Sequence, residues 1–221
     1  MTEPLSHTIS SQLMFRLRNR ILAGDYAPGS ALRQDTLAAE FGTSKIPVRE
    51  ALVQLQSEGL VDIFPQRGFQ VRPLSASELD EVFRLRLQIE PTAVARGAKC
   101  ATVDDRVAAR GALSRLNDAI AAGEFTSSGH LNRAFHLTLI VPRLHPVAAE
   151  VLGRLHTLAQ RYVQAHLRPE GRFKRATREH NALYEAWNGG RGKEAAMLTQ
   201  AHIAATRDDL ERVVQARTKT I

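Results

Sequence analysis

The stretch LAAEFGTSKIPVREALVQLQSEGLV, residues 37–61, decides the fold of the first part of the chain. Its apolar residues recur every three or four positions, and in the second half they include Val48 and Leu52. This spacing predicts a short helix over residues 34–41 and a longer one over residues 45–58, which meet across a tight turn that contains glycine. Two helices in this order are typical of a helix-turn-helix, whose second helix enters the major groove of DNA.

The flanking residues complete a small domain around this pair of helices. Apolar residues at helical spacing predict a first helix over residues 7–23. Residues 60–64 and 69–71 predict two β-strands, and Pro65-Gln66-Arg67-Gly68 between them predicts the turn of a hairpin. We therefore expect an N-terminal winged helix-turn-helix with a small β-hairpin as its wing.

The pattern changes at Arg72-Pro73-Leu74, because proline disfavours a helix at the residue before it. Beyond this point Ser75–Glu78 and Thr102–Asp105 each have the spacing of a capping box, which opens a helix. Only helices are expected from here on, at about residues 76–98, 103–122, 128–141, 146–167, 173–188 and 191–216. We expect a mainly α protein of two domains: a DNA-binding winged helix-turn-helix over residues 1–73, and an all-helical ligand-binding and dimerisation bundle over residues 74–221.

Composition narrows the class of protein without identifying the DNA-binding segment. The chain of 221 residues has a net charge of +7, but residues 1–73 carry only +1 and residues 74–221 carry +6. The arrangement of charges, and not their sum, must therefore locate a nucleic-acid interface. The single cysteine, Cys100, excludes an intramolecular disulfide, and no run of about 18 apolar residues predicts a membrane span. We expect a cytoplasmic protein that does not enter a membrane.

Donor side chains gather at the start of the helix predicted over residues 45–58. Lys45 and Arg49 are four residues apart, so they share one helix face in the first turns and can reach a guanine edge or phosphates. Thr43 and Ser44 precede the helix and can cap it or donate to a phosphate.

The predicted wing offers a second point of contact. Arg67 lies beside Gly68 at the tip of the hairpin, where a thin loop can place a cation in the minor groove. An alternative assigns Lys45 and Arg49 to an ordinary solvated helix face, or pairs Arg49 with Glu50 or Glu58.

The first 73 residues resemble the winged-helix domain of the GntR family of transcription regulators. The resemblance is carried by Gly24, Pro28-Gly29, Leu32, Leu37-Ala38, Phe41-Gly42, the run SKIPVREAL at 44–52, Leu55, Glu58-Gly59-Leu60-Val61 and Arg67-Gly68-Phe69. The family usually has arginine where Lys45 stands, and lysine keeps the charge but not the two-pronged hydrogen bonding to a base. Asp35 stands near a position where some members contact DNA through arginine, so that contact is not expected here.

Polar residues at helical spacing in the second half suggest a metal site. Asn132 and His136 share a helix face, and His180 and His202 lie in two other predicted helices. Imidazoles with one oxygen donor suit zinc, nickel or a similar divalent ion. The residues alone leave two alternatives open: such histidines can be surface or core groups, and other histidines could serve instead, namely His130, His145, His156 and His166.

The helical half also resembles the effector domain of the FadR subfamily, called FCD. Arg86-Leu-Gln-Ile-Glu90 with Ala93 and Ala95, Asn132-Arg-Ala-Phe-His136, Glu179-His180 and His202 carry this resemblance. It implies that Asn132, His136, His180 and His202 hold a divalent metal at the floor of a cavity. Asn132 replaces the commoner aspartate and removes a negative charge, so partial or absent metal occupancy is compatible with the sequence.

Arg86 is the candidate effector-binding residue. Its guanidinium could clamp the carboxylate of a small-molecule effector, or it could pair with Glu90 four residues on. The family resemblance implies a homodimer on a roughly palindromic operator, most commonly a repressor released by its ligand. The alternative function is a metal-dependent enzyme that uses the three histidines, with Glu179 as the nearest general base.

Overall fold

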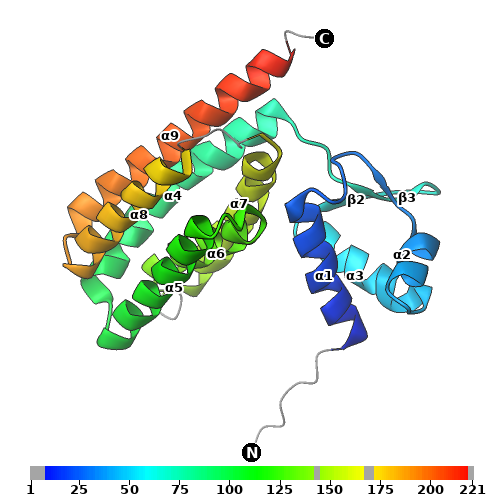
Figure 1. Ribbon diagram of the computed structural model, residues 1–221, viewed down its shortest axis with the longest axis horizontal. Coiled ribbons are helices and arrows are strands. Elements are labelled where there is room, and N and C mark those ends of the chain that lie inside the picture. The colour runs from blue at the N-terminus through cyan, green and yellow to red at the C-terminus, as the bar shows by residue number, and fades with distance from the viewer. Residues whose placement is uncertain (1–7, 142–144, 167–171, 219–221) are drawn as a thin grey trace, which may run out of the picture. The chain divides into compact units, whose positions relative to one another are not determined.

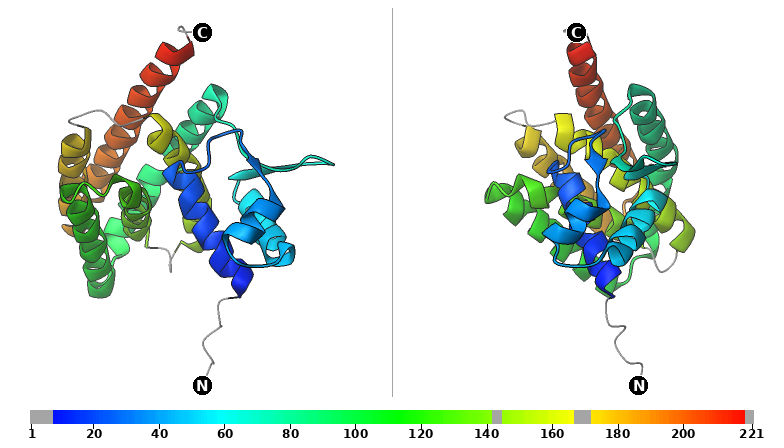
Figure 2. Two further views of the ribbon diagram at one scale, coloured as in Figure 1. Left: turned by 45° about the vertical axis from the view of Figure 1, so that its right-hand side comes forward. Right: turned by 90° about the vertical axis from the view of Figure 1, so that its right-hand side faces the viewer.

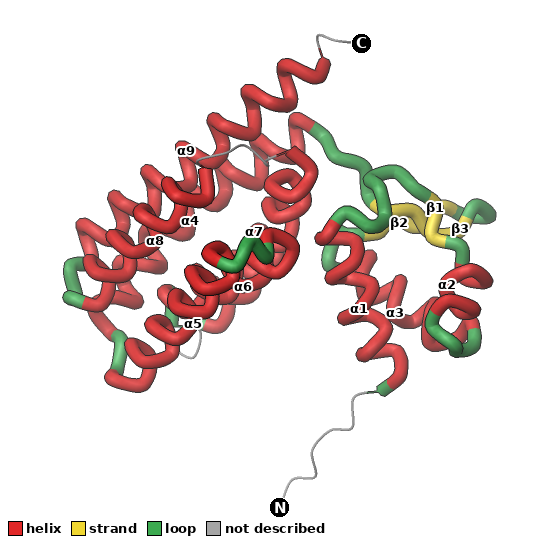
Figure 3. Tube along the Cα trace, in the orientation of Figure 1, coloured by secondary structure: helices red, strands yellow, loops and turns green. Residues whose placement is uncertain are grey.

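The computed structural model describes residues 8–141, 145–166 and 172–218. The chain divides into two compact units between Leu74 and Ser75. Within the described residues, the β-strands belong to the first unit and the second is built of helices (Figures 1 and 3). The expected fold class, an N-terminal winged helix-turn-helix followed by an all-helical bundle, is confirmed.

The first unit has a three-helix core with a small sheet at its edge. Its elements are α1 (Ile9–Ala23), β1 (Ala31–Leu32), α2 (Gln34–Glu40), α3 (Lys45–Ser57), β2 (Val61–Phe64) and β3 (Gly68–Val71). The apolar stripe of α1 packs on α3, and Leu17, Leu52 and Leu55 are completely buried between them. Gly24 caps the C-terminal end of α1, and its backbone is left-handed (φ 88°), a conformation that glycine adopts without a steric penalty.

The sheet contains one strand that the sequence analysis missed. The strands are antiparallel in the order β1-β3-β2, so β3 lies between the predicted partner β2 and the additional β1. Leu32 of β1 pairs with Phe69 of β3, and both side chains are buried. A strand of two residues has no periodicity of its own, and it forms here because a distant strand supplies its hydrogen-bond partners. Figure 2 shows the β2–β3 hairpin projecting beyond the helices of its own unit.

The second unit is a bundle of α4 (Ala76–Cys100), α5 (Val103–Ala121), α6 (Phe125–Leu139), α7 (Pro146–His166), α8 (Arg172–Asn188) and α9 (Gly192–Thr218). The long helices α4 and α9 run side by side, and α7 and α8 also pack on α4 (Figure 1). Among the described residues, the largest completely buried side chains of this unit include Trp187, Tyr162, Phe83 and Phe135.

Two predicted capping boxes have different outcomes. Thr102 and Asp105 bond reciprocally at the start of α5, as expected. At the start of α4 the Ser75 side chain accepts from the Glu78 amide, but the Ser75 amide donates to the Tyr162 hydroxyl. The Glu78 carboxylate accepts hydrogen bonds from Tyr162 and Arg161 of α7. These long-range bonds replace the bond to the Ser75 amide that a capping box would contain.

A glycine in α4 permits a close approach of three helices. A Cβ atom at Gly97 would lie 2.0 Å from the backbone oxygen of Leu139. The indole Nε1 of Trp187 donates to the same oxygen at 2.7 Å. Because this carbonyl at the end of α6 is buried, the indole satisfies a group that water cannot reach.

Candidate functional site

The N-terminus of α3 carries the side chains predicted to contact DNA. Ser44 precedes the helix with an extended backbone, and its side chain makes no capping hydrogen bond. Lys45 and Arg49 are exposed one turn apart, and Thr43 is half-buried beside them. The first amides of a helix lack partners within it, so backbone donors and two cations are available to an anion at this end.

The two cations differ in their neighbours. Lys45 Nζ lies 2.5 Å from Asp35 Oδ1 of α2, and both side chains are mostly exposed. Arg49 forms no ion pair within the part of the chain that the structure describes. Its suggested pairing with Glu58 is not formed, because the Glu58 carboxylate is engaged by Arg18 of α1.

The wing presents a cation on a tight turn. The Arg67 amide donates to the Phe64 carbonyl oxygen at 3.1 Å, which closes a four-residue turn between β2 and β3. Gln66 and Gly68 have positive φ angles of 64° and 84°. The Arg67 side chain is exposed, in agreement with its expected place at the tip of the hairpin.

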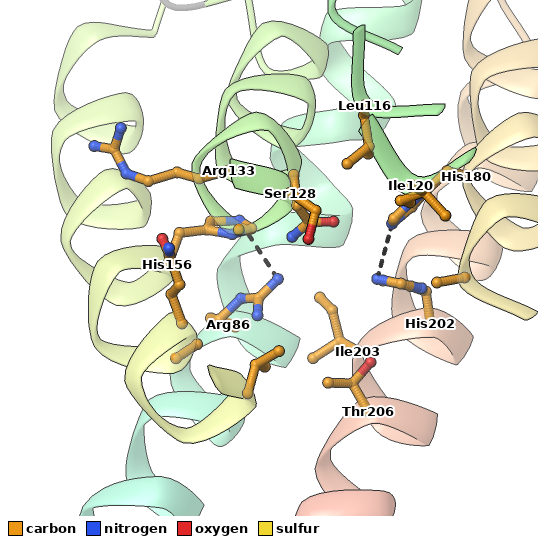
Figure 4. Close-up of a pocket in the computed structure, with 16 residues that line it drawn as sticks. Arg86, Leu116, Ile120, Ser128, Arg133, His156, His180, His202, Ile203 and Thr206 are labelled. Atoms are coloured by element: carbon orange, nitrogen blue, oxygen red, sulfur yellow. Dashed lines mark hydrogen bonds between the residues drawn. The ribbon is translucent and has the colours of Figure 1, made fainter. Parts of the chain in front are cut away.

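The second unit brings three predicted metal ligands together. His136 of α6, His180 of α8 and His202 of α9 are close enough for one nitrogen of each to share an ion. His180 Nε2 and His202 Nε2 are 3.3 Å apart (Figure 4), and two nitrogens of a tetrahedral zinc site are separated by about 3.3–3.4 Å. His136 Nε2 is buried and has no hydrogen-bond partner among the described residues. These donors therefore fit a divalent ion.

Carboxylates lie beside the far nitrogens of two of these rings. His202 Nδ1 is 2.7 Å from Glu179 Oε2, and His136 Nδ1 is 3.1 Å from Glu90 Oε1. Burial lowers the pKa of His136 to about 4 and also lowers the pKa of His202. Both imidazoles are therefore neutral at pH 7, which is the form that binds a metal.

Asn132, the fourth predicted ligand, lines a cavity next to these histidines. The cavity has a volume of about 90 Å³, and His180, His202 and Arg86 also line it (Figure 4). Ser128, Gln160 and Thr206 contribute polar side chains to its lining. The sequence analysis did not identify these three residues, because single polar residues within apolar helices carry no distinguishing pattern.

Arg86 combines the two arrangements that the sequence left open. Its Nε donates to Glu90 Oε2 at 2.9 Å, four residues along α4, and its side chain also reaches the cavity. Only 5% of its surface is exposed. A guanidinium has five N–H donors, so the pairing with Glu90 leaves others for a ligand.

Of the alternative histidines whose side chains are described, His156 of α7 joins this region. His156 Nε2 lies 3.1 Å from Glu90 Oε1, and Glu90, His136 and His156 form a second group with the spacing of metal ligands. The positive charge of Arg86 beside Glu90 opposes a second cation there. Among the described side chains, His130 and His145 belong to neither group, and the side chain of His166 lies outside the described residues.

A helix needs about 20 mostly apolar residues to cross a bilayer, which limits the described helices that could do so. None of them combines the length and the apolar character needed to cross a membrane.

Comparison with known proteins places both units in one family. A family model described as "Bacterial regulatory proteins, gntR family" matches residues 9–71, and the FCD domain model matches residues 81–205. The transcriptional repressor GlaR of Escherichia coli is 32% identical over 161 residues, which cover 70% of this chain and 73% of GlaR. YdhC of Bacillus subtilis, an uncharacterized HTH-type transcriptional regulator, is 25% identical over 205 residues, 92% of each chain.

Solved structures show the same fold. The structure of McbR/YncC from E. coli superimposes with a TM-score of 0.81 at 22% identity, and the match covers 93% of this chain and 98% of that one. The FCD match alone spans more than half of the chain, and the winged-helix match accounts for the segment before it. The chain therefore belongs to the GntR family of bacterial regulatory proteins, and it is a DNA-binding transcription regulator of the type that carries an FCD domain.

Proposed function

We propose that this regulator is a homodimer that binds a roughly palindromic operator, and that a small carboxylate controls its operator affinity. The observation that carries the proposal is a cavity of about 90 Å³. Arg86 lines it together with His180 and His202, two of the candidate metal ligands. A cationic guanidinium and an adjacent metal site are complementary to a carboxylate. We propose Asn132, His136, His180 and His202 as the metal ligands.

The residues of the chain have separate roles in holding the ligand. The metal, of the zinc or nickel type, would supply positive charge at the floor of the cavity. Arg86 would supply two further N–H donors, already oriented by Glu90. A volume of about 90 Å³ accommodates roughly six to nine water-sized atoms, which points to a small organic acid.

On the DNA side, the proposal assigns base and phosphate contacts to the start of α3. Arg49 would reach a guanine edge, and Lys45 would contact a phosphate. Thr43 and Ser44 would donate to the backbone next to the amides of the first turn. Arg67 with Gly68 would place the wing in or along the minor groove. The exposure of Lys45, Arg49 and Arg67 supports these roles.

Repression relieved by the ligand is the proposed direction of control. GlaR, which shares 32% identity, is described as a repressor. For useful control, the effector must favour one of two states of the protein by about 1–3 kcal/mol.

A metal-dependent enzyme is the less favoured alternative. Such an enzyme needs a general base beside the metal. Glu179, the candidate base, lies 2.7 Å from His202 Nδ1 and forms a further ion pair with Arg175. It therefore has a structural role in holding a ligand ring.

The DNA assignment is tested by recovering genomic fragments on the purified protein, followed by affinity measurements on the enriched sequence. Arg49→Ala should weaken specific binding by about 1–3 kcal/mol while the protein stays folded. Arg154→Ala removes the same charge from an exposed position on α7 and serves as the matched control. Unchanged operator affinity in a folded Arg49→Ala protein would refute the assignment.

The effector assignment is tested with a panel of two- to six-carbon carboxylates, scored by release from the operator and by thermal stabilisation. Arg86→Lys keeps the charge but loses the paired donors, so it should reduce the response to the active acid. Failure of every acid in the panel to change operator affinity or melting temperature would count against a carboxylate effector.

A further inference from the structure

A buried carboxylate joins three polar side chains of the second unit. Glu90 of α4 is 1% exposed and contacts three nitrogen-bearing side chains from three helices. Its Oε2 accepts from Arg86 Nε at 2.9 Å, and its Oε1 lies 3.1 Å from both His156 Nε2 and His136 Nδ1. One side chain thus links the arginine of the cavity to a histidine of the metal site.

The hydrogen-bonding role of Glu90 follows from these neighbours. The Arg86 guanidinium has only donors and bonds Glu90 Oε2, and the imidazole of His156 lies within hydrogen-bond distance of Oε1. Glu90 is therefore an acceptor at both oxygens. His156 Nε2 cannot both donate to Glu90 and accept from Arg86. Because its contact with Glu90 is the shorter of the two, we infer that it donates to Glu90.

Glu90 also determines which ring nitrogen of His136 carries the proton. A carboxylate oxygen that acts as an acceptor 3.1 Å from Nδ1 favours the tautomer that carries its proton there. The lone pair is then on Nε2, the nitrogen available to an ion shared with His180 and His202. His136 Nδ1 lies at ion-pair distance from Glu90 but forms no hydrogen bond of ordinary geometry, and we expect coordination of Nε2 to turn the ring so that this bond forms.

We propose that Glu90 is a positioning residue that holds Arg86 with one oxygen and sets the metal-binding tautomer of His136 with the other. The proposal rests on the metal and effector roles given above. Glutamine cannot replace glutamate here, because its amide has one acceptor oxygen and one donor nitrogen, whereas the native site presents donors to both oxygens. Glu90→Gln therefore leaves either Arg86 or His136 without an acceptor.

The decisive measurement uses zinc alone and the full-length protein, so it does not depend on an operator or an effector. Metal affinity is determined by competition with a chromophoric chelator. Glu90→Gln should weaken zinc binding by about 10- to 100-fold, the usual effect of losing such an outer partner. Glu150→Gln, at an exposed position on α7, is the matched control and should bind zinc as the wild type does. Glu90→Asp keeps two acceptor oxygens and should recover part of the loss.

Nitrogen-detected NMR of the metal-free wild type tests the tautomer directly. The His136 ring should carry its proton on Nδ1 at neutral pH. A proton on Nε2, or wild-type zinc affinity in a folded Glu90→Gln protein, would overturn the proposal. If Glu90→Gln does not fold, the NMR measurement of the His136 tautomer in the wild type tests the proposal on its own. If the protein binds zinc as expected but no carboxylate changes its operator affinity or melting temperature, the effector assignment is refuted. The role of Glu90 in orienting His136 would still stand.

Discussion

The ion pair between Lys45 and Asp35 predicts a gain in DNA affinity on removal of a single acidic group. Lys45 must leave Asp35 before it can contact a phosphate, and the two side chains are 63% and 78% exposed. Pairs this exposed contribute about 0–1 kcal/mol, so Asp35→Asn should hardly change folding stability. The freed lysine should raise the affinity for a non-specific duplex by up to about fivefold, the equivalent of 1 kcal/mol.

Fluorescence anisotropy at several salt concentrations provides the measurement. One additional phosphate contact makes the slope of log K against log salt steeper by about 0.9. Asp80→Asn removes the same charge from an exposed position on α4 and controls for a general change in net charge. Asp35→Asn in a Lys45→Ala background should lose most of its gain, because the lysine is no longer there to be released. An equal gain in that background, or in Asp80→Asn, would refute the argument.

Three further predictions concern the metal site, the helix packing and base recognition. Replacing His136 and His180 together with alanine should abolish bound metal, which elemental analysis of the purified protein measures; retained metal would contradict the ligand assignment. Gly97→Ala should lower the free energy of unfolding by about 1–3 kcal/mol, because the new Cβ would collide with a backbone oxygen. In Gly111→Ala the new Cβ meets only a flexible arginine side chain at 3.4 Å, so this control should raise the free energy of unfolding by about 0.5–1 kcal/mol. Ile46 is 70% exposed in the first turn of α3, so Ile46→Ser should weaken selection for thymine at one operator position in a randomised-site experiment, and an unchanged profile would exclude a methyl contact.

Local sequence signals predicted the helices well, because glycine, proline and capping residues stand at most of their ends. The observed α3, Lys45–Ser57, differs by one residue from the expected 45–58, and α5, Val103–Ala121, differs by one from 103–122. The shortest strand, β1, was missed because its partner is about 40 residues away in the sequence. A pattern confined to a few residues cannot register such a pairing.

The convergence of three histidines was predictable from the sequence, but their surroundings were not. His136 and its two partner histidines followed from the family resemblance, and the structure brings them within reach of one ion. Glu90 was suggested only as a local partner of Arg86. Its contacts with His136 and His156 depend on how α4, α6 and α7 pack, which no local spacing encodes.

The uncapped start of α3 has a consequence for the behaviour of the free protein. A capping side chain typically stabilises a helix by about 1 kcal/mol, and Ser44 does not make this bond. The first turn of α3 should therefore open often in solution, and its amides should exchange with deuterium quickly. A phosphate group seated there would act as the missing cap, so exchange should slow at Lys45 and Ile46 when DNA is bound. The nucleic acid would then complete the secondary structure of the element that recognises it.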